Sequence, residues 1–216
     1  MSAHFPPGRR QVLQHLALQG MAGLTVSAAV FSKAAAAGPT EEILSQSVRT
    51  ALTAAVAAAA PPEPLLAHEA QRQAYAQWRA QSSEQLARWL PQSLERLEFL
   101  QTLWYEARRA GLSLSLVLGL IQTESAFRKF AISSSGARGY MQVMPFWTRS
   151  IGDGDESKLF HMQTNLRFGC VILRYLLDRE QGDLSLGLGR YNGSRGQLPY
   201  PRAVLSAQRA WLKAVD

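Results

Sequence analysis

Apolar positions recur at helical spacing along much of this chain, and no stretch shows the two-residue alternation of a strand. Residues 113–127 are the clearest case, with an apolar stripe that consists of Leu114, Val117, Leu118 and Ile121. This spacing predicts an amphipathic helix. The stripe continues onto Glu124, so the sequence predicts a carboxylate that faces inward from this helix.

Helix breakers mark further helices before this one. Residues 41–59 favour helix, a proline-rich break follows, and residues 65–90 resume the helical pattern. Pro91 opens another predicted helix that runs to Arg109, with Gly111 closing it. The predicted fold class is therefore all-α.

Glu124 is the only acidic side chain between residues 107 and 152. A carboxylate held against apolar neighbours loses hydration, which raises its pKa and suits a general acid. The alternative is a partly exposed acid at a helix end that pairs with Arg128 or Lys129. The stretch that follows favours chemistry, because a loop rich in serine and glycine leads into methionines and a glutamine at 141–144.

Three short motifs follow one another in a specific order. They are Glu-Ser-Ala-Phe at 124–127, Gly-Tyr-Met-Gln-Val-Met-Pro at 139–145 and Arg-Tyr-Asn-Gly at 190–193. With an intervening helical stretch at 165–177, they resemble the soluble lytic transglycosylases, whose catalytic domain is related to goose-type lysozyme. The resemblance covers about residues 96–216 and implies an all-α, lysozyme-like fold.

The resemblance implies roles for six residues. Glu124 matches the catalytic acid/base of the family. The expected substrate-binding residues are Ser125, Gln142, Met144, Tyr191 and Asn192. The Tyr191 hydroxyl is expected to lie close to the Glu124 carboxylate and to orient it through a hydrogen bond. No cofactor is implied, and no metal site is readable from the sequence.

The implied reaction cleaves the β-1,4 bond between N-acetylmuramic acid and N-acetylglucosamine in peptidoglycan glycan strands, leaving a 1,6-anhydro sugar. One acid/base suffices because the substrate assists its own cleavage. One alternative is a muramidase that uses water, for which Asp153, Asp155 or Glu156 would have to approach Glu124. The other is a non-catalytic murein-binding scaffold of an envelope-spanning system.

Three positions depart from the family pattern. Tyr140 stands where leucine is usual, Arg190 stands where a small alanine commonly precedes Tyr-Asn, and His161 stands where an acidic or polar residue is common. These departures bear on the shape of the sugar subsites and leave the assignment of Glu124 unchanged.

Residues 1–37 resemble a twin-arginine signal peptide. Arg9 and Arg10 precede a modestly apolar stretch, and cleavage is predicted near Ala37. We therefore predict export to the bacterial periplasm, with no stable membrane insertion after signal removal. Without this segment 20 basic and 16 acidic side chains remain, a mild positive charge that suits murein. The sequence contains no run of five or six basic residues, so nucleic acid is not expected as a partner.

The predicted domain organisation has three parts: a signal peptide at 1–37, a helical N-terminal region at 38–95 and the catalytic domain at 96–216. The alanine-rich helix in the region 38–95 has a weak apolar face, so three alternatives stay open: it is mobile, it packs on the catalytic domain, or it contacts a partner in an envelope complex. The single cysteine, Cys170, is predicted to be buried on a helix. Trp147 is a candidate for stacking on a sugar, although tryptophans at helical spacing more often belong to the core.

Overall fold

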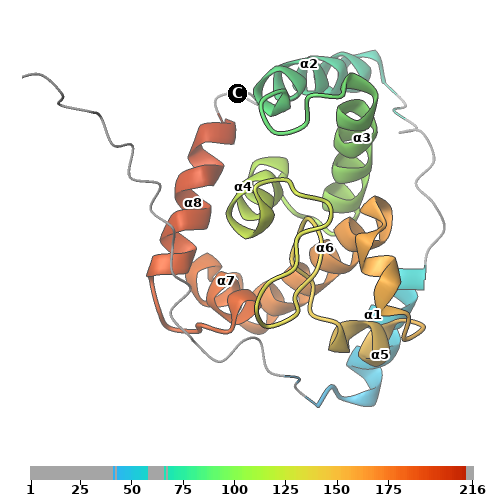
Figure 1. Ribbon diagram of the computed structural model, residues 1–216, viewed down its shortest axis with the longest axis vertical. Coiled ribbons are helices and arrows are strands. Elements are labelled where there is room, and N and C mark those ends of the chain that lie inside the picture. The colour runs from blue at the N-terminus through green and yellow to red at the C-terminus, as the bar shows by residue number, and fades with distance from the viewer. Residues whose placement is uncertain (1–40, 42, 58–65, 67, 213–216) are drawn as a thin grey trace, which may run out of the picture. The chain divides into compact units, whose positions relative to one another are not determined.

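The computed structural model describes residues 41, 43–57, 66 and 68–212 (Figure 1). Its helices are α1 (Gln46–Ala57), α2 (Glu69–Leu86), α3 (Ser93–Arg109), α4 (Leu114–Ser125), α5 (Phe146–Ile151), the 3-10 helix η1 (Glu156–Phe160), α6 (Met162–Arg179), α7 (Leu184–Asn192) and α8 (Pro199–Leu212). Within these residues β-type pairing is limited to isolated bridges that Arg138 makes with Ile132 and Val143. The all-α fold class is therefore confirmed.

The helices that apolar spacing predicts are present, and local residues explain where they begin and end. α4 begins after Ser113, whose side-chain oxygen accepts a hydrogen bond from the Leu116 amide at 3.3 Å. It ends where Ala126 takes a left-handed φ of 48°. α3 ends at Arg109 and is followed by Gly111 at a φ of 65°, a common way to close a helix.

The first two turns of α4 are buried on every side. All eight residues from Leu114 to Ile121 are buried, because α8 packs along one side of the helix and α3 along another (Figure 1). The sequence predicts a one-sided apolar stripe, so burial is more extensive than expected. Gly119 permits the close approach, since a Cβ there would lie 2.6 Å from the backbone nitrogen of Gln208 in α8.

A buried ion pair joins α3 to α6. Arg167 Nη2 lies 2.8 Å from Glu106 Oε1, and Arg109 Nε lies 3.4 Å from Glu106 Oε2. The same two arginines reach the end of α1, where Arg109 donates to the Ala55 carbonyl and Arg167 donates to the Val56 carbonyl at 3.5 Å. Three helices are thus tied together around one carboxylate.

The helical N-terminal extension of the predicted fold class is confirmed for the described helices. α2 packs on α3 and buries Trp78, while α1 packs against α5 and α6. The domain boundaries stay predictions, and the signal peptide at 1–37 lies outside the described residues. Among the residues described, no helix combines the length and the apolarity needed to cross a membrane. Cys170 on α6 is buried, as predicted.

Candidate active site

Glu124 lies in the last turn of α4 and is half-buried. Its Oε1 accepts a hydrogen bond of 2.5 Å from the hydroxyl of Tyr200, which stands in the first turn of α8. Burial, followed by the charge of Glu124 and this hydrogen bond, raises the pKa of Tyr200 well above its ordinary value. Tyr200 therefore keeps its proton and remains a hydrogen-bond donor to the carboxylate.

Tyr191 of α7 is a second tyrosine near the same carboxylate, and its side chain is buried. Its hydroxyl donates to the Met141 carbonyl at 2.8 Å. Burial, followed by the charge of Glu124, raises the pKa of Tyr191 well above its ordinary value. The hydrogen bond to the acid that we expected from Tyr191 is the one that Tyr200 makes, because the single hydroxyl proton of Tyr191 is directed to Met141.

The loop after α4 is held by one buried amide, Asn165 of α6. Its Oδ1 accepts from the Met141 amide at 2.8 Å, and its Nδ2 donates to the carbonyls of Arg138 and Leu159, both at 2.8 Å. Gly139 makes room for this arrangement, since a Cβ at its φ of 75° would collide with the Asn165 amide. The glycine of the motif is therefore required by the fold of the loop.

Ser125 and Gln142 both bond to the backbone of this loop. Ser125 is 1% exposed, and its hydroxyl donates to the Tyr140 carbonyl at 2.7 Å. Gln142 has a positive φ of 49°, and its Nε2 donates to the carbonyls of Ala131 and Gly139 at 3.1 and 3.0 Å. Ser125 is therefore buried under the loop and holds its backbone. The motif predicts a contact with the substrate instead.

A pocket of about 200 Å³ brings several predicted site residues together. Its lining includes Gln142, Met144 and Tyr191, together with Leu44 from far upstream in the chain. Trp147 also lines it, but its ring is buried and packs on the neighbouring Phe146 with 5.2 Å between ring centroids. Glu124 does not line this pocket; the residue that links the two is Tyr191, which lines the pocket and lies close enough to Glu124 for the charge of that acid to raise its pKa.

Asn192 ends α7 and donates to the Ser194 hydroxyl at 2.9 Å. The preceding Arg190 pairs with Glu180, and Arg195 donates to both oxygens of that carboxylate at 2.8 and 2.9 Å. Arg195 and then Arg190 lower the pKa of Glu180 to about 2. Both arginines line the pocket, so one of its sides carries two cations and one anion.

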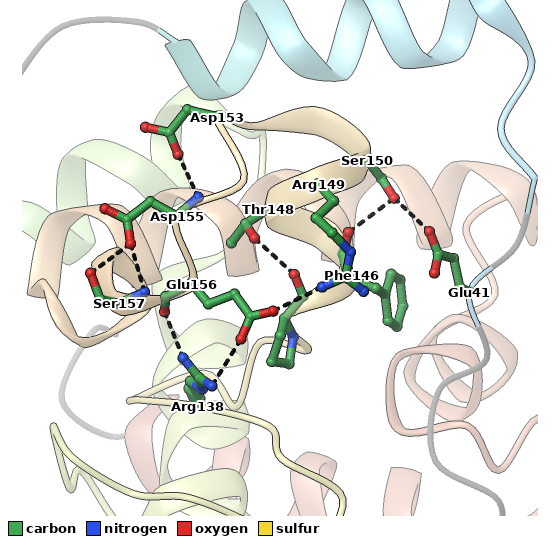
Figure 2. Close-up of polar contacts among 11 residues, drawn as sticks. Glu41, Arg138, Phe146, Thr148, Arg149, Ser150, Asp153, Asp155, Glu156 and Ser157 are labelled. Atoms are coloured by element: carbon green, nitrogen blue, oxygen red, sulfur yellow. Dashed lines mark hydrogen bonds and ion pairs between the residues drawn. The ribbon is translucent and has the colours of Figure 1, made fainter.

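The acids before and at the start of η1 are held by contacts with neighbouring groups, one of which is Arg138 of the loop after α4 (Figure 2). Glu156 accepts hydrogen bonds from Arg138 at 2.9 Å and from Arg149 at 2.8 Å. Asp153 accepts from the Asp155 amide, and Asp155 caps η1. These three carboxylates order the turn between the two short helices.

The sequence matches the family described as "Transglycosylase SLT domain" over residues 102–206. Residues 102–206 belong to the SLT transglycosylase family. The SLT match contains all the motifs described above, from Glu124 to Asn192, and also Tyr200. It begins inside α3 and ends inside α8.

Known relatives resemble the SLT part of the chain. A transglycosylase of Enterobacteria phage PRD1 is 33% identical over 101 residues, which cover 47% of this chain and 37% of that protein. The membrane-bound lytic murein transglycosylase C of Actinobacillus pleuropneumoniae serotype 5b is 36% identical over 80 residues, covering 33% of this chain and 22% of that protein. The chain thus matches well under half the length of each relative.

A solved structure is also similar. It is an inactive mutant of the lytic transglycosylase Slt from Pseudomonas aeruginosa, at a TM-score of 0.48 and 23% sequence identity. The similarity covers 65% of this chain and 30% of the Slt chain.

One residue of the SLT domain that contacts Glu124 was missed by the sequence reasoning. That residue is Tyr200. The available signal was the order Pro199, Tyr200, Pro201 at the start of a helix. Prolines fix φ in a first helical turn, so a tyrosine between them is held in a defined direction.

Two of the departures from the family motif have structural explanations. Tyr140 is fully buried, packs on Phe99 with 5.0 Å between ring centroids and donates to Glu95 at 3.4 Å. It therefore belongs to the core and does not line the pocket. Arg190 instead lines the pocket, so it is the departure that alters the surroundings of the candidate site.

Proposed function

We propose that this protein is a peptidoglycan lytic transglycosylase with Glu124 as its single acid/base. The observation that carries the proposal is the 2.5 Å hydrogen bond from Tyr200 to Glu124, beside the pocket lined by Gln142, Met144 and Tyr191. The names of the relatives and the SLT match support it. The substrate is the glycan strand of peptidoglycan, and Gln142, Met144, Tyr191 and Asn192 are proposed to contact it.

In the first step Glu124 donates its proton to the glycosidic oxygen between N-acetylmuramic acid and N-acetylglucosamine. The bond from that oxygen to the anomeric carbon breaks, and its electron pair stays on the leaving oxygen. The N-acetyl group of the muramoyl sugar stabilises the positive anomeric carbon. Tyr200 stabilises the carboxylate that forms, since hydrogen bonds to charged acceptors are among the stronger ones.

In the second step the Glu124 carboxylate accepts the proton of the muramoyl 6-hydroxyl while that oxygen attacks the anomeric carbon. A 1,6-anhydro ring forms, the acid is regenerated, and no water is consumed. The attacking oxygen belongs to the substrate itself, so the step has the effective-concentration advantage of an intramolecular reaction.

The contacts of the three acids that a muramidase could use favour this route over hydrolysis. An inverting or retaining hydrolase commonly needs a second carboxylate beside the scissile bond. Glu156 is paired with two arginines, and Asp153 and Asp155 accept hydrogen bonds within their own turn. A muramidase would have to release one of them from these contacts.

We also propose that the protein acts in the bacterial envelope, after export by the twin-arginine route. Arg9 and Arg10 support this proposal, together with the envelope substrate named for the lytic murein transglycosylase relatives. A partner in an envelope complex, bound through the region 38–95, stays a prediction.

The deciding experiment is mass spectrometry of the soluble products released from purified murein sacculi, with Glu124→Gln as the matched variant. Muropeptides with anhydro ends, one water lighter than hydrolytic products, should appear with the wild type. The variant should lose activity by about 10²–10⁴-fold, the usual contribution of a general acid/base, at unchanged thermal stability. Reducing ends in place of anhydro ends would identify a muramidase. Binding to sacculi without any product would identify a scaffold.

A further inference from the structure

Leu44 occupies an unexpected place beside the proposed sugar subsites. It lies 80 positions before Glu124, outside the SLT match, and yet lines the same pocket as Gln142, Met144 and Tyr191. Only 7% of its surface is exposed, whereas its neighbour Ile43 is 99% exposed. The Leu44 side chain therefore points into the pocket, and the side chain of Ile43 just before it points into solvent.

Contacts at both ends hold this segment, which we call the N-terminal strap (residues 41 and 43–57). At its beginning, Glu41 accepts a hydrogen bond from Ser150 of α5 at 3.3 Å (Figure 2). At its end, the Ala55 and Val56 carbonyls accept from Arg109 and Arg167, respectively. α1 packs on α5 and α6 between these points.

The arginines that hold the strap are themselves fixed. Glu106, which has no exposed side-chain area, pairs with both Arg109 and Arg167. Their positive charges also face the C-terminal end of α1, where the helix dipole is negative. These contacts favour a strap that stays docked as a wall of the pocket, in contrast to a lid that opens in every cycle.

We propose that the N-terminal strap closes one end of the glycan-binding pocket through Leu44 and directs cleavage to the ends of glycan strands. This inference rests on the proposed transglycosylase function. The pocket, at about 200 Å³, is smaller than the roughly 300–1,000 Å³ of typical small-molecule sites. A strand that enters it is therefore stopped after a short stretch, and the bond placed at Glu124 lies near the end of the strand.

The test compares Leu44→Ala with Ile43→Ala by chromatography and mass spectrometry of the anhydro-ended products from sacculi. Wild type and Ile43→Ala should release mainly single disaccharide units from the start of digestion. Leu44→Ala should raise the fraction of longer products by roughly tenfold, the factor that 1.4 kcal/mol of added binding provides. Leu44→Phe, which keeps the position apolar and full, should retain the short products. Thermal melts of all variants establish that they are folded.

Several results would overturn the proposal. Long products from the wild type would show that the pocket does not stop the strand. A product pattern that Leu44→Ala leaves unchanged would show that Leu44 is no barrier. A higher total rate with the same product lengths would instead identify the strap as an inhibitory lid. Absence of anhydro products from every variant would refute the proposed function itself, a failure that is distinct from these three.

Discussion

α4 and the N-terminal strap both contribute to the proposed site, but different forces hold them in place. Eight consecutive residues of α4 are buried. In the strap the buried apolar residues are Leu44 and Leu52, while Ile43 is almost fully exposed. The strap relies in addition on hydrogen bonds that Arg109 and Arg167 donate to its last carbonyls.

The difference has energetic consequences. A large apolar side chain contributes roughly 1.5–3 kcal/mol when it is buried, whereas a hydrogen bond adds about 1 kcal/mol net. α4 draws its stability from many such burials, so no single side chain decides whether it stays packed. The strap depends on two leucines and a few polar contacts, and one substitution can release it. The shape of the pocket and the stability of the fold are therefore separable in this protein.

Arg167→Met should have the largest effect, because Arg167 holds the strap and also belongs to the buried ion pair between α3 and α6. The change removes a partner of the buried Glu106 and a donor to the strap. Loss of one partner from a buried ion pair costs about 3–5 kcal/mol, and urea unfolding should show a loss of that size. Arg174→Met on the same helix removes an exposed pair with Asp178 and should cost at most about 1 kcal/mol. Equal losses in the two variants would contradict this account of the ion pair.

Tyr200→Phe would sharpen the comparison, because it removes a hydrogen bond between α4 and α8 and leaves the strap untouched. The variant loses the donor to Glu124, and kcat on sacculi should fall by roughly 10- to 100-fold, as for an interaction of 1.4–2.7 kcal/mol. KM and the lengths of the products should stay the same. Tyr140→Phe removes a buried hydroxyl that points to Glu95 and should retain full activity. Equal activity of both variants would remove Tyr200 from the mechanism.

Acid should have the smallest effect, and it should loosen the end of α7 while the strap stays in place. Arg195 and Arg190 hold the pKa of Glu180 at about 2, against 4.5 for the free group. Because the folded pKa is the lower one, this contribution to stability is complete above about pH 4.5. It is lost as the pH falls toward 2. Hydrogen exchange should increase at the end of α7 over this range, while arginine donors keep α1 protected.

Glu180→Gln removes the titrating group from this cluster. In this variant, amide hydrogen exchange at the end of α7 should therefore no longer change with pH between about 4.5 and 2 as it does in the wild type. The same pH dependence in Glu180→Gln and the wild type would assign the effect to another acid.

The sequence predicted those parts of the fold that local patterns specify. α3 and α4 follow from apolar spacing and from residues such as Ser113 and Gly111 at their ends. Asp183 likewise caps α7, where its carboxylate accepts a hydrogen bond from the Leu186 amide at 2.8 Å. For such features the physical cause lies within a few residues of the effect.

The candidate site was predicted less completely, because its contacts join distant residues. Motif resemblance led to Glu124, Gln142, Met144 and Tyr191, and the structure places the last three at one pocket. No local pattern links Tyr200 to an acid 76 positions earlier. The burial of Leu44 likewise depends on the arginines of α3 and α6, which apolar spacing does not pair with a segment so far upstream.

The distance in sequence between Glu124 and Tyr200 also determines when the proposed site can assemble. A growing chain exposes the acid of α4 well before the tyrosine of α8 emerges. The two groups meet only after α8 has packed along α4, a step that the absence of a side chain at Gly119 permits. The hydrogen bond from Tyr200 to Glu124 is therefore among the last contacts of the proposed site to form during synthesis of the chain.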